Sequence, residues 1–203
     1  MDTNAVLLTL IGAILGALFS LIIPFILYKV FVPKIKFADE ICKGPPTTAN
    51  EIYNYRLKFR NLGRDIFELN IYCVISIPNL RSVGTYQRVE LNVYYNFKPV
   101  LKRKDGQYHD CIVRISFNDD RMRTEFMRPI YEDAIREKAD KRELTLEDLL
   151  TIKQGTYLNF YISAHDKLLG NKKMFESKPY SIEDIKFGKY KFGELCVVQK
   201  DEV

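Results

Sequence analysis

The stretch that decides the fold covers residues 61–78 and reads NLGRDIFELNIYCVISIP. Its first five residues have the composition of a turn. From Phe67 onward, apolar side chains alternate with the side chains of the other face until Pro78 ends the run. Because successive side chains of a strand point to opposite faces of a sheet, this alternation predicts a strand that is buried on one face.

The same alternation recurs on both sides of this stretch. Six further segments read as strands or contain strands: 53–60, 85–97, 111–117, 156–164, 172–177 and 185–198. The first strand is expected to begin near Lys34, so the predicted domain covers residues 34–203. Seven or eight short strands separated by turns predict two packed sheets, an immunoglobulin-like β-sandwich. An apolar content of 47% and a charged content of 28% exclude a disordered chain.

A helical insertion is expected to interrupt the strands at about residues 118–154. Pro129 marks the start of a helical pattern that ends near Asp140. Thr145 and Asp148 have the spacing of a capping motif, which predicts a second short helix through Thr151. Two interpretations remain open for this insertion. It is either a solvated helical hairpin at the rim of the sandwich or a sensor and docking element.

The N-terminal segment differs from the rest of the chain. Residues 5–28 read AVLLTLIGAILGALFSLIIPFILY, and no charged residue lies between positions 3 and 28. About 20 helical residues cross a hydrocarbon core about 30 Å thick, so the run predicts a single-pass transmembrane helix over residues 1–29. A cleaved signal peptide would carry a basic start and a shorter apolar core. Residues 30–33 are the predicted connector to the sandwich.

The basic residues next to this run set the expected orientation. Lys29, Lys34 and Lys36 follow the apolar segment, whereas its N-terminal flank carries only Asp2. These lysines are the candidate membrane-surface residues, because basic flanks stay on the cytoplasmic side of a membrane. The N-terminus is therefore predicted outside the cell and the C-terminal domain in the cytoplasm. The lipid bilayer is the first expected partner.

Small residues form a stripe along the predicted helix. At about 100° per residue, its members share an arc of about 100°. The stripe comprises Thr9, Gly12, Ala13, Gly16 and Ser20. Small residues at this spacing let helix backbones approach closely in lipid, so the stripe predicts a homo-oligomer. In a dimer the stripe would be a packing seam, and in a ring of four or more helices it would line a pore. Pro24 is expected to kink the helix.

The sequence carries no recognisable catalytic site. No nucleophile elbow, phosphate-binding loop or zinc-spaced set of cysteines and histidines is present, so no enzyme activity, metal or cofactor is expected. Basic residues cluster in two places, Lys102, Arg103 and Lys104, and Arg121, Arg123 and Arg128. Aromatic residues lie nearby, a combination typical of sites for anionic nucleotides or oligonucleotides. Attraction to anionic lipids is the alternative.

This organisation resembles the Hailong-type channel effectors, small bacterial membrane proteins of anti-phage defence. The resemblance is carried by GAILGALFS in the helix, by NLGRDIFELNIYCVISIP in the sandwich, and by the insertion at 118–154. It implies an inner-membrane ion channel of four or more copies. The sandwich would gate the channel on sensing an anionic nucleotide, an oligonucleotide or a partner protein. The alternative is a membrane-anchored, non-catalytic adaptor that recruits a cytoplasmic partner.

Overall fold

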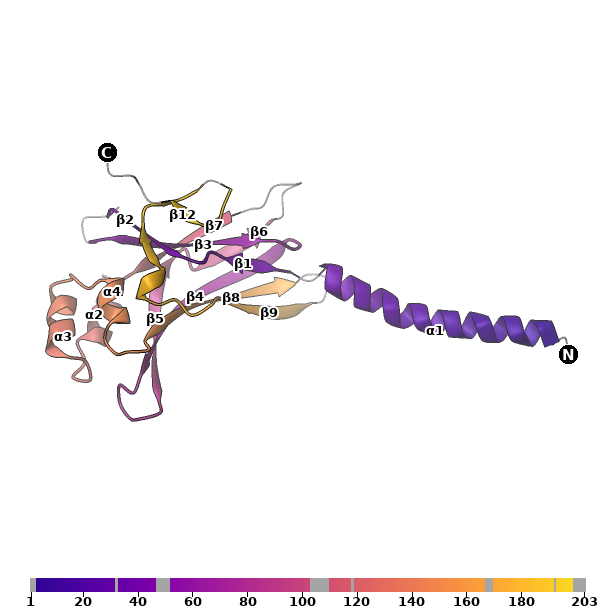
Figure 1. Ribbon diagram of the computed structural model, residues 1–203, viewed down its shortest axis with the longest axis horizontal. Helices are drawn as coiled ribbons and strands as arrows, with labels where there is room; N and C mark the ends of the chain where they lie inside the picture. Colours follow the sequence, from indigo (N-terminus) through magenta and orange to yellow (C-terminus); the bar gives the residue numbers. More distant parts are fainter. Residues whose placement is uncertain are drawn as a thin grey trace.

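The chain forms a β-rich domain with a long N-terminal helix, as seen in the computed structural model (Figure 1). The structure describes residues 3–31, 33–46, 52–102, 110–117, 119–166, 170–191 and 193–198. Side chains of the N-terminal helix are described from Thr9 to Phe25. The three short helices lie at the end of the β domain that is away from the N-terminal helix.

Ten of the described strands form one sheet, with the central order β10-β2-β3-β7-β5-β4-β8-β9. In addition, β1 pairs with β3 and β6 pairs with β4. The strands of this sheet are β1 (Ile35–Phe37), β2 (Ile41–Gly44), β3 (Asn54–Asn61), β4 (Ile66–Pro78), β5 (Tyr86–Tyr94), β6 (Phe97–Leu101), β7 (Asp110–Ser116), β8 (Tyr157–Asp166), β9 (Asn171–Glu176) and β10 (Ile185–Phe187). All pairs are antiparallel except the parallel pair of β10 and β2.

Strand β5 joins the two halves of the sheet. Its residues Tyr86–Leu91 pair with β4, and its last residues, Asn92–Tyr94, pair with β7. The sheet therefore curls continuously, so that its two halves face each other (Figure 1). The predicted immunoglobulin-like sandwich of two separate sheets is wrong. A curled sheet buries one face of each strand just as a sandwich does, so alternation predicts the strands but not their partners.

The core fills the inside of this curl. Inward-facing residues of the strands meet side chains of the helical insertion and of the segment before β10. The largest side chains that are almost completely buried are Tyr55, Phe59, Phe126, Phe160 and Tyr180. Tyr180 donates a hydrogen bond of 2.5 Å to the carbonyl of Ala38, which satisfies its buried hydroxyl. The core is therefore contiguous across the sheet and the helices.

The insertion contains three helices, α2 (Asp120–Phe126), α3 (Asp133–Asp140) and α4 (Leu146–Leu150). The predicted helix after Pro129 and the capping motif before α4 are confirmed. Thr145 Oγ1 accepts from the Asp148 amide at 3.2 Å, and the Asp148 carboxylate accepts from the Thr145 amide at 3.0 Å. Helix α2 is not predicted as a separate element. Two of its residues, Arg121 and Arg123, are predicted only as part of a basic cluster.

The C-terminal region is broken into short pieces rather than forming one strand over residues 185–198, as had been predicted. After a 3₁₀ turn, η1 (Ile182–Asp184), β10 is followed by β11 (Lys189–Tyr190), which pairs with β12 (Val197–Val198). Gly188 separates β10 from β11 with a φ of 151°, a backbone conformation that favours glycine. This break moves the chain out of the large sheet.

The N-terminal helix α1 covers Thr3–Phe31 and projects from the β domain (Figure 1). The helix continues past Pro24. Among the residues that the structure describes, no helix has the length and apolarity needed to cross a membrane. This finding overturns the expectation that the fold includes a single-pass transmembrane helix over residues 1–29.

The capping box of α4 gives the first testable prediction. Thr145→Ala removes the acceptor of the Asp148 amide, so the free energy of unfolding is expected to fall by about 1 kcal/mol. Urea unfolding of the full chain in mild detergent measures this change. Thr124→Ala is the matched control, because the Thr124 hydroxyl donates to the carbonyl of Asp120 within α2 and caps no helix. An equal loss in both variants contradicts the prediction.

Candidate functional site

The small residues of α1 lie on an uncovered helix. Every residue from Thr9 to Phe25 is exposed, including Gly12, Ala13, Gly16 and Ser20. A Cβ added to Gly12 or Gly16 would have no atom within 4 Å, so neither glycine is required by a contact within the described chain. The Ser20 hydroxyl donates to the carbonyl of Ala17 at 2.7 Å. The stripe is therefore open to a partner.

The candidate membrane-surface lysines lie where α1 meets the β domain. Lys34 and Lys36 are exposed, before and within β1. The side chain of Lys29 lies outside the described residues. Of the first basic cluster, Lys102 is exposed after β6, whereas Arg103 and Lys104 also lie outside the described part of the chain.

The second basic cluster is not a set of converging cations. Arg128 contacts Glu125 at 2.9 Å and Arg123 pairs with Asp140. Arg121 lies 3.8 Å from Glu90. Each arginine thus has its own acidic partner. All three pairs lie at the surface, where an ion pair contributes about 0–1 kcal/mol.

A polar hollow of about 340 Å³ lies between β5 and α2. Two of the three predicted arginines, Arg121 and Arg128, line it, and Arg123 does not. Three further charged residues line the same hollow: Arg88, Glu90 and Glu125. Sequence spacing does not connect Arg88 with this cluster, because Arg88 lies more than 30 positions before it. The hollow therefore offers mixed charge with one excess cation.

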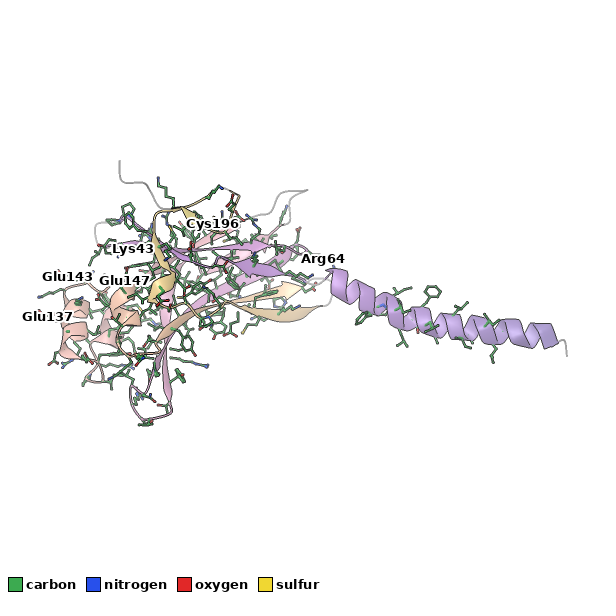
Figure 2. All side chains as sticks on the ribbon, viewed as in Figure 1. Lys43, Arg64, Glu137, Glu143, Glu147 and Cys196 are labelled. Carbon is green, nitrogen blue, oxygen red and sulfur yellow. The ribbon has the colours of Figure 1, made fainter. Side chains whose placement is uncertain are left out.

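A charged cluster attaches the helical insertion to the sheet. Glu147 of α4 accepts a hydrogen bond from Lys43 Nζ at 2.6 Å and another from the Tyr55 hydroxyl (Figure 2). The Lys43 ammonium also lies 3.6 Å from the centre of the Tyr53 ring. Burial and the adjacent Glu147 carboxylate raise the pKa of Tyr55, so its hydroxyl stays a donor. These residues are far apart in sequence, and the sequence reading missed them.

A second cluster holds the C-terminal strap, which we define as residues 188–191 and 193–198. Lys58 is almost completely buried and contacts Asp110 at 2.7 Å. Its ammonium also donates to the carbonyls of Lys191 and Glu194, at 3.2 and 2.7 Å. Arg60 pairs with the same Asp110 at 2.6 Å and donates to the carbonyl of Gly193 at 2.7 Å. The strap is therefore tied to the outer side of β3.

Asp110 pairs with both of these cations. Burial opposes the ionised form of Asp110, but hydrogen bonds and charges from Arg60 and Lys58 outweigh burial and lower its pKa. The cluster has the structure of a buried salt bridge with satisfied donors. The cluster links β3 and β7 to the strap, which supports a structural role.

The described residues contain no group of three or more histidine, cysteine, aspartate or glutamate side chains arranged to hold a metal ion. The comparisons with known proteins add no relative. No protein-family model matches the chain, and no curated protein matches it significantly.

The buried cluster at Asp110 gives the second prediction. Asp110→Asn leaves the buried Lys58 ammonium without a carboxylate, so the free energy of unfolding is expected to fall by about 3 kcal/mol. Urea unfolding in mild detergent measures it. The matched control is Glu137→Gln, which breaks the exposed pair with Lys141 and is expected to leave stability unchanged.

Asp110→Asn is also expected to change how the stability of the fold depends on pH. The lowered pKa of Asp110 means that its pairing stabilises the fold fully above the ordinary aspartate pKa near 4. This stability is lost as the pH falls through the folded-state pKa. Asp110→Asn is therefore expected to unfold with a weaker pH dependence below about pH 4 than the native chain. An unchanged acid profile contradicts the assignment.

Proposed function

We propose that this protein is a non-catalytic, membrane-associated effector that assembles through α1 and binds a signal through its β domain. The observation that carries the proposal is the uncovered apolar surface of α1. Leu10, Phe19 and Leu21 are 60%, 57% and 72% exposed, and the other described side chains of α1 are exposed as well. A helix that is apolar on all sides is stable only when something apolar surrounds it.

Lipid and further copies of α1 are the surroundings that fit this surface. Burial of apolar surface contributes about 25 cal/mol per Å², so an uncovered helix of this kind favours association strongly. The small-residue stripe supports contact between copies, because Gly12 and Gly16 leave open space for a neighbouring backbone. The exposed Lys34 and Lys36, close to the end of α1, suit an anionic headgroup layer.

The β domain supports the binding part of the proposal. Its core is complete, its insertion and strap are tied down by charged clusters, and its outer face carries exposed polar and aromatic side chains. A signal bound there would reach the assembly through the chain that joins β1 to α1. An adaptor that recruits a cytoplasmic partner uses the same parts, and it differs only in lacking channel activity.

Assembly through the stripe gives the third prediction. Gly16→Leu fills the space that a neighbouring helix would occupy, so the oligomer is expected to dissociate in mild detergent. Leu18→Phe is the control, since at about 100° per residue Leu18 lies about 180° from Thr9, opposite the stripe. Light scattering of detergent complexes measures the mass. A native chain that is monomeric, or that stays in the aqueous fraction of a cell lysate, contradicts the proposal.

Depolarisation of the membrane, the effect expected from the resemblance to anti-phage effectors, gives the fourth prediction. Expression of the native chain under activating conditions, such as phage infection, is expected to depolarise cells. Gly16→Leu is expected to abolish depolarisation while the protein stays in the membrane fraction, and Leu18→Phe is expected to preserve it. A voltage-sensitive dye measures the potential. An unchanged potential with an intact, membrane-bound oligomer favours the adaptor instead.

A further inference from the structure

The outer face of the curled sheet carries a continuous line of aromatic side chains. Along β4, the residues Ile71, Cys73 and Ile75 are buried in the core. The residues that alternate with them along the strand, including Tyr72 and Ser76, point to the opposite, outer face. Directly opposed residues of antiparallel strands lie on the same face, so the strand register identifies their neighbours there.

Four of the five outward-facing positions of β4 from Asn70 to Pro78 have an aromatic neighbour on an adjacent strand, and the exception is Val74. Tyr72 lies opposite Tyr161 of β8, and Ser76 lies opposite Tyr157 of β8. Pro78 lies opposite Tyr86 of β5, and Asn70 lies opposite Phe97 of β6. We call this set the aromatic track: Tyr72, Tyr86, Phe97, Tyr157 and Tyr161. From Asn70 to Pro78 it extends about 27 Å, at about 3.4 Å per residue.

The rings of the track are accessible. Tyr86, Phe97 and Tyr72 are 55%, 52% and 37% exposed, and Tyr157 and Tyr161 are half-buried. The rings of Tyr86 and Tyr157 lie 5.9 Å apart in an edge-to-face arrangement. The residues between the rings are small or polar, as at Ser76. The track therefore offers exposed aromatic surface at Tyr86, Phe97 and Tyr72.

A buried polar group in the same face has an unused acceptor. Asn159 is opposite Val74, between the two tyrosine rows, and is 3% exposed. Its Nδ2 donates to Glu176 Oε1 and to the carbonyl of Ser177, both at 3.2 Å. Among the described residues, no donor reaches its Oδ1. An unpartnered buried acceptor costs about 1–3 kcal/mol, and a ligand would reach this oxygen only after a neighbouring side chain moves.

Positive charge lies at one end of the track. Arg88 is opposite Ser76 on the outer face and is exposed. The same Arg88 lines the polar hollow with Arg121 and Arg128, which leaves one cation in excess of Glu90 and Glu125. An anionic group at the hollow would meet the guanidinium groups of Arg121 and Arg128, whose ion pairs with Glu90 and Glu125 lie at the surface.

We propose that the aromatic track binds single-stranded nucleic acid. Unpaired bases would stack on the tyrosines and Phe97. Phosphates at the hollow would contact Arg88 and its neighbouring arginines. Stacking on exposed aromatic rings beside a few cations is how proteins hold single strands without reading duplex grooves. The inference deepens the proposed function by naming the signal, and the binding itself does not require assembly of α1.

Fluorescence anisotropy of a labelled ten-residue oligothymidylate with the full chain in mild detergent tests this inference and is the fifth prediction. Tyr72→Ala and Tyr86→Ala are each expected to raise the dissociation constant about tenfold, because each removes a stacking face. Arg88→Glu is expected to weaken binding and to reduce its salt dependence. Circular dichroism verifies that each variant is folded.

The matched controls lie away from the track, in the edge strand β10 and in β11 of the small two-stranded sheet. Phe187→Ala removes an aromatic ring of β10 that is 52% exposed, and Lys189→Glu reverses an exposed charge of β11. Both are expected to bind like the native chain. Oligothymidylate affinity that Tyr72→Ala and Tyr86→Ala leave unchanged overturns the inference. Absent oligothymidylate binding overturns it too, as does preferential binding of an uncharged oligosaccharide such as cellohexaose.

The failure of this inference is distinguishable from failure of the proposed function. The oligomer mass and the membrane fraction are measured on the same variants. Loss of oligonucleotide binding in Tyr86→Ala with an unchanged oligomer supports the track as the binding site. Conversely, Gly16→Leu is expected to bind the oligonucleotide as the native chain does, because α1 contributes no residue to the track.

Discussion

The pairing of β5 with two different neighbours is the constraint on which the rest of the fold depends. Its first six residues pair with β4 and its last three with β7, so one strand belongs to both halves of the sheet. The halves must then face each other, and one core serves both. The same curl turns the opposite face of every strand outward, which is why Tyr72 and Arg88 share a surface although they come from different strands.

Two attachments complete this curl, and both depend on charge. Glu147 connects α4 to β2 and β3, and the Lys58–Asp110 pair connects β3 and β7 to the strap. Breaking a buried pair costs about 3–5 kcal/mol, whereas an exposed pair contributes about 0–1 kcal/mol. The charges that hold the fold are thus Lys58 and Asp110. The exposed pair of Arg123 and Asp140 can be broken at little cost.

Local patterns in the sequence predict local structure well and distant pairing poorly. Alternation predicted β3 and β4, and the Thr145 motif predicted the start of α4, because each depends on residues a few positions apart. Whether strands form a sandwich or a curled sheet depends on which distant segments pair. The pairing of β5 with both β4 and β7 cannot be predicted from the residues of β5 alone. For the same reason, no spacing rule pairs Tyr72 with Tyr161.

The basic cluster shows why counting cations locates a ligand poorly. Arg121, Arg123 and Arg128 are close in sequence, but the fold directs them to three different acids. A phosphate must compete with those acids for each guanidinium, and the gain per contact is small at the surface. Stacking on a ring displaces no such partner, and each stacked base contributes about 1–3 kcal/mol. In the proposed complex the aromatic rings therefore determine where the nucleic acid binds, and the arginines of the hollow contact the phosphates nearest to them.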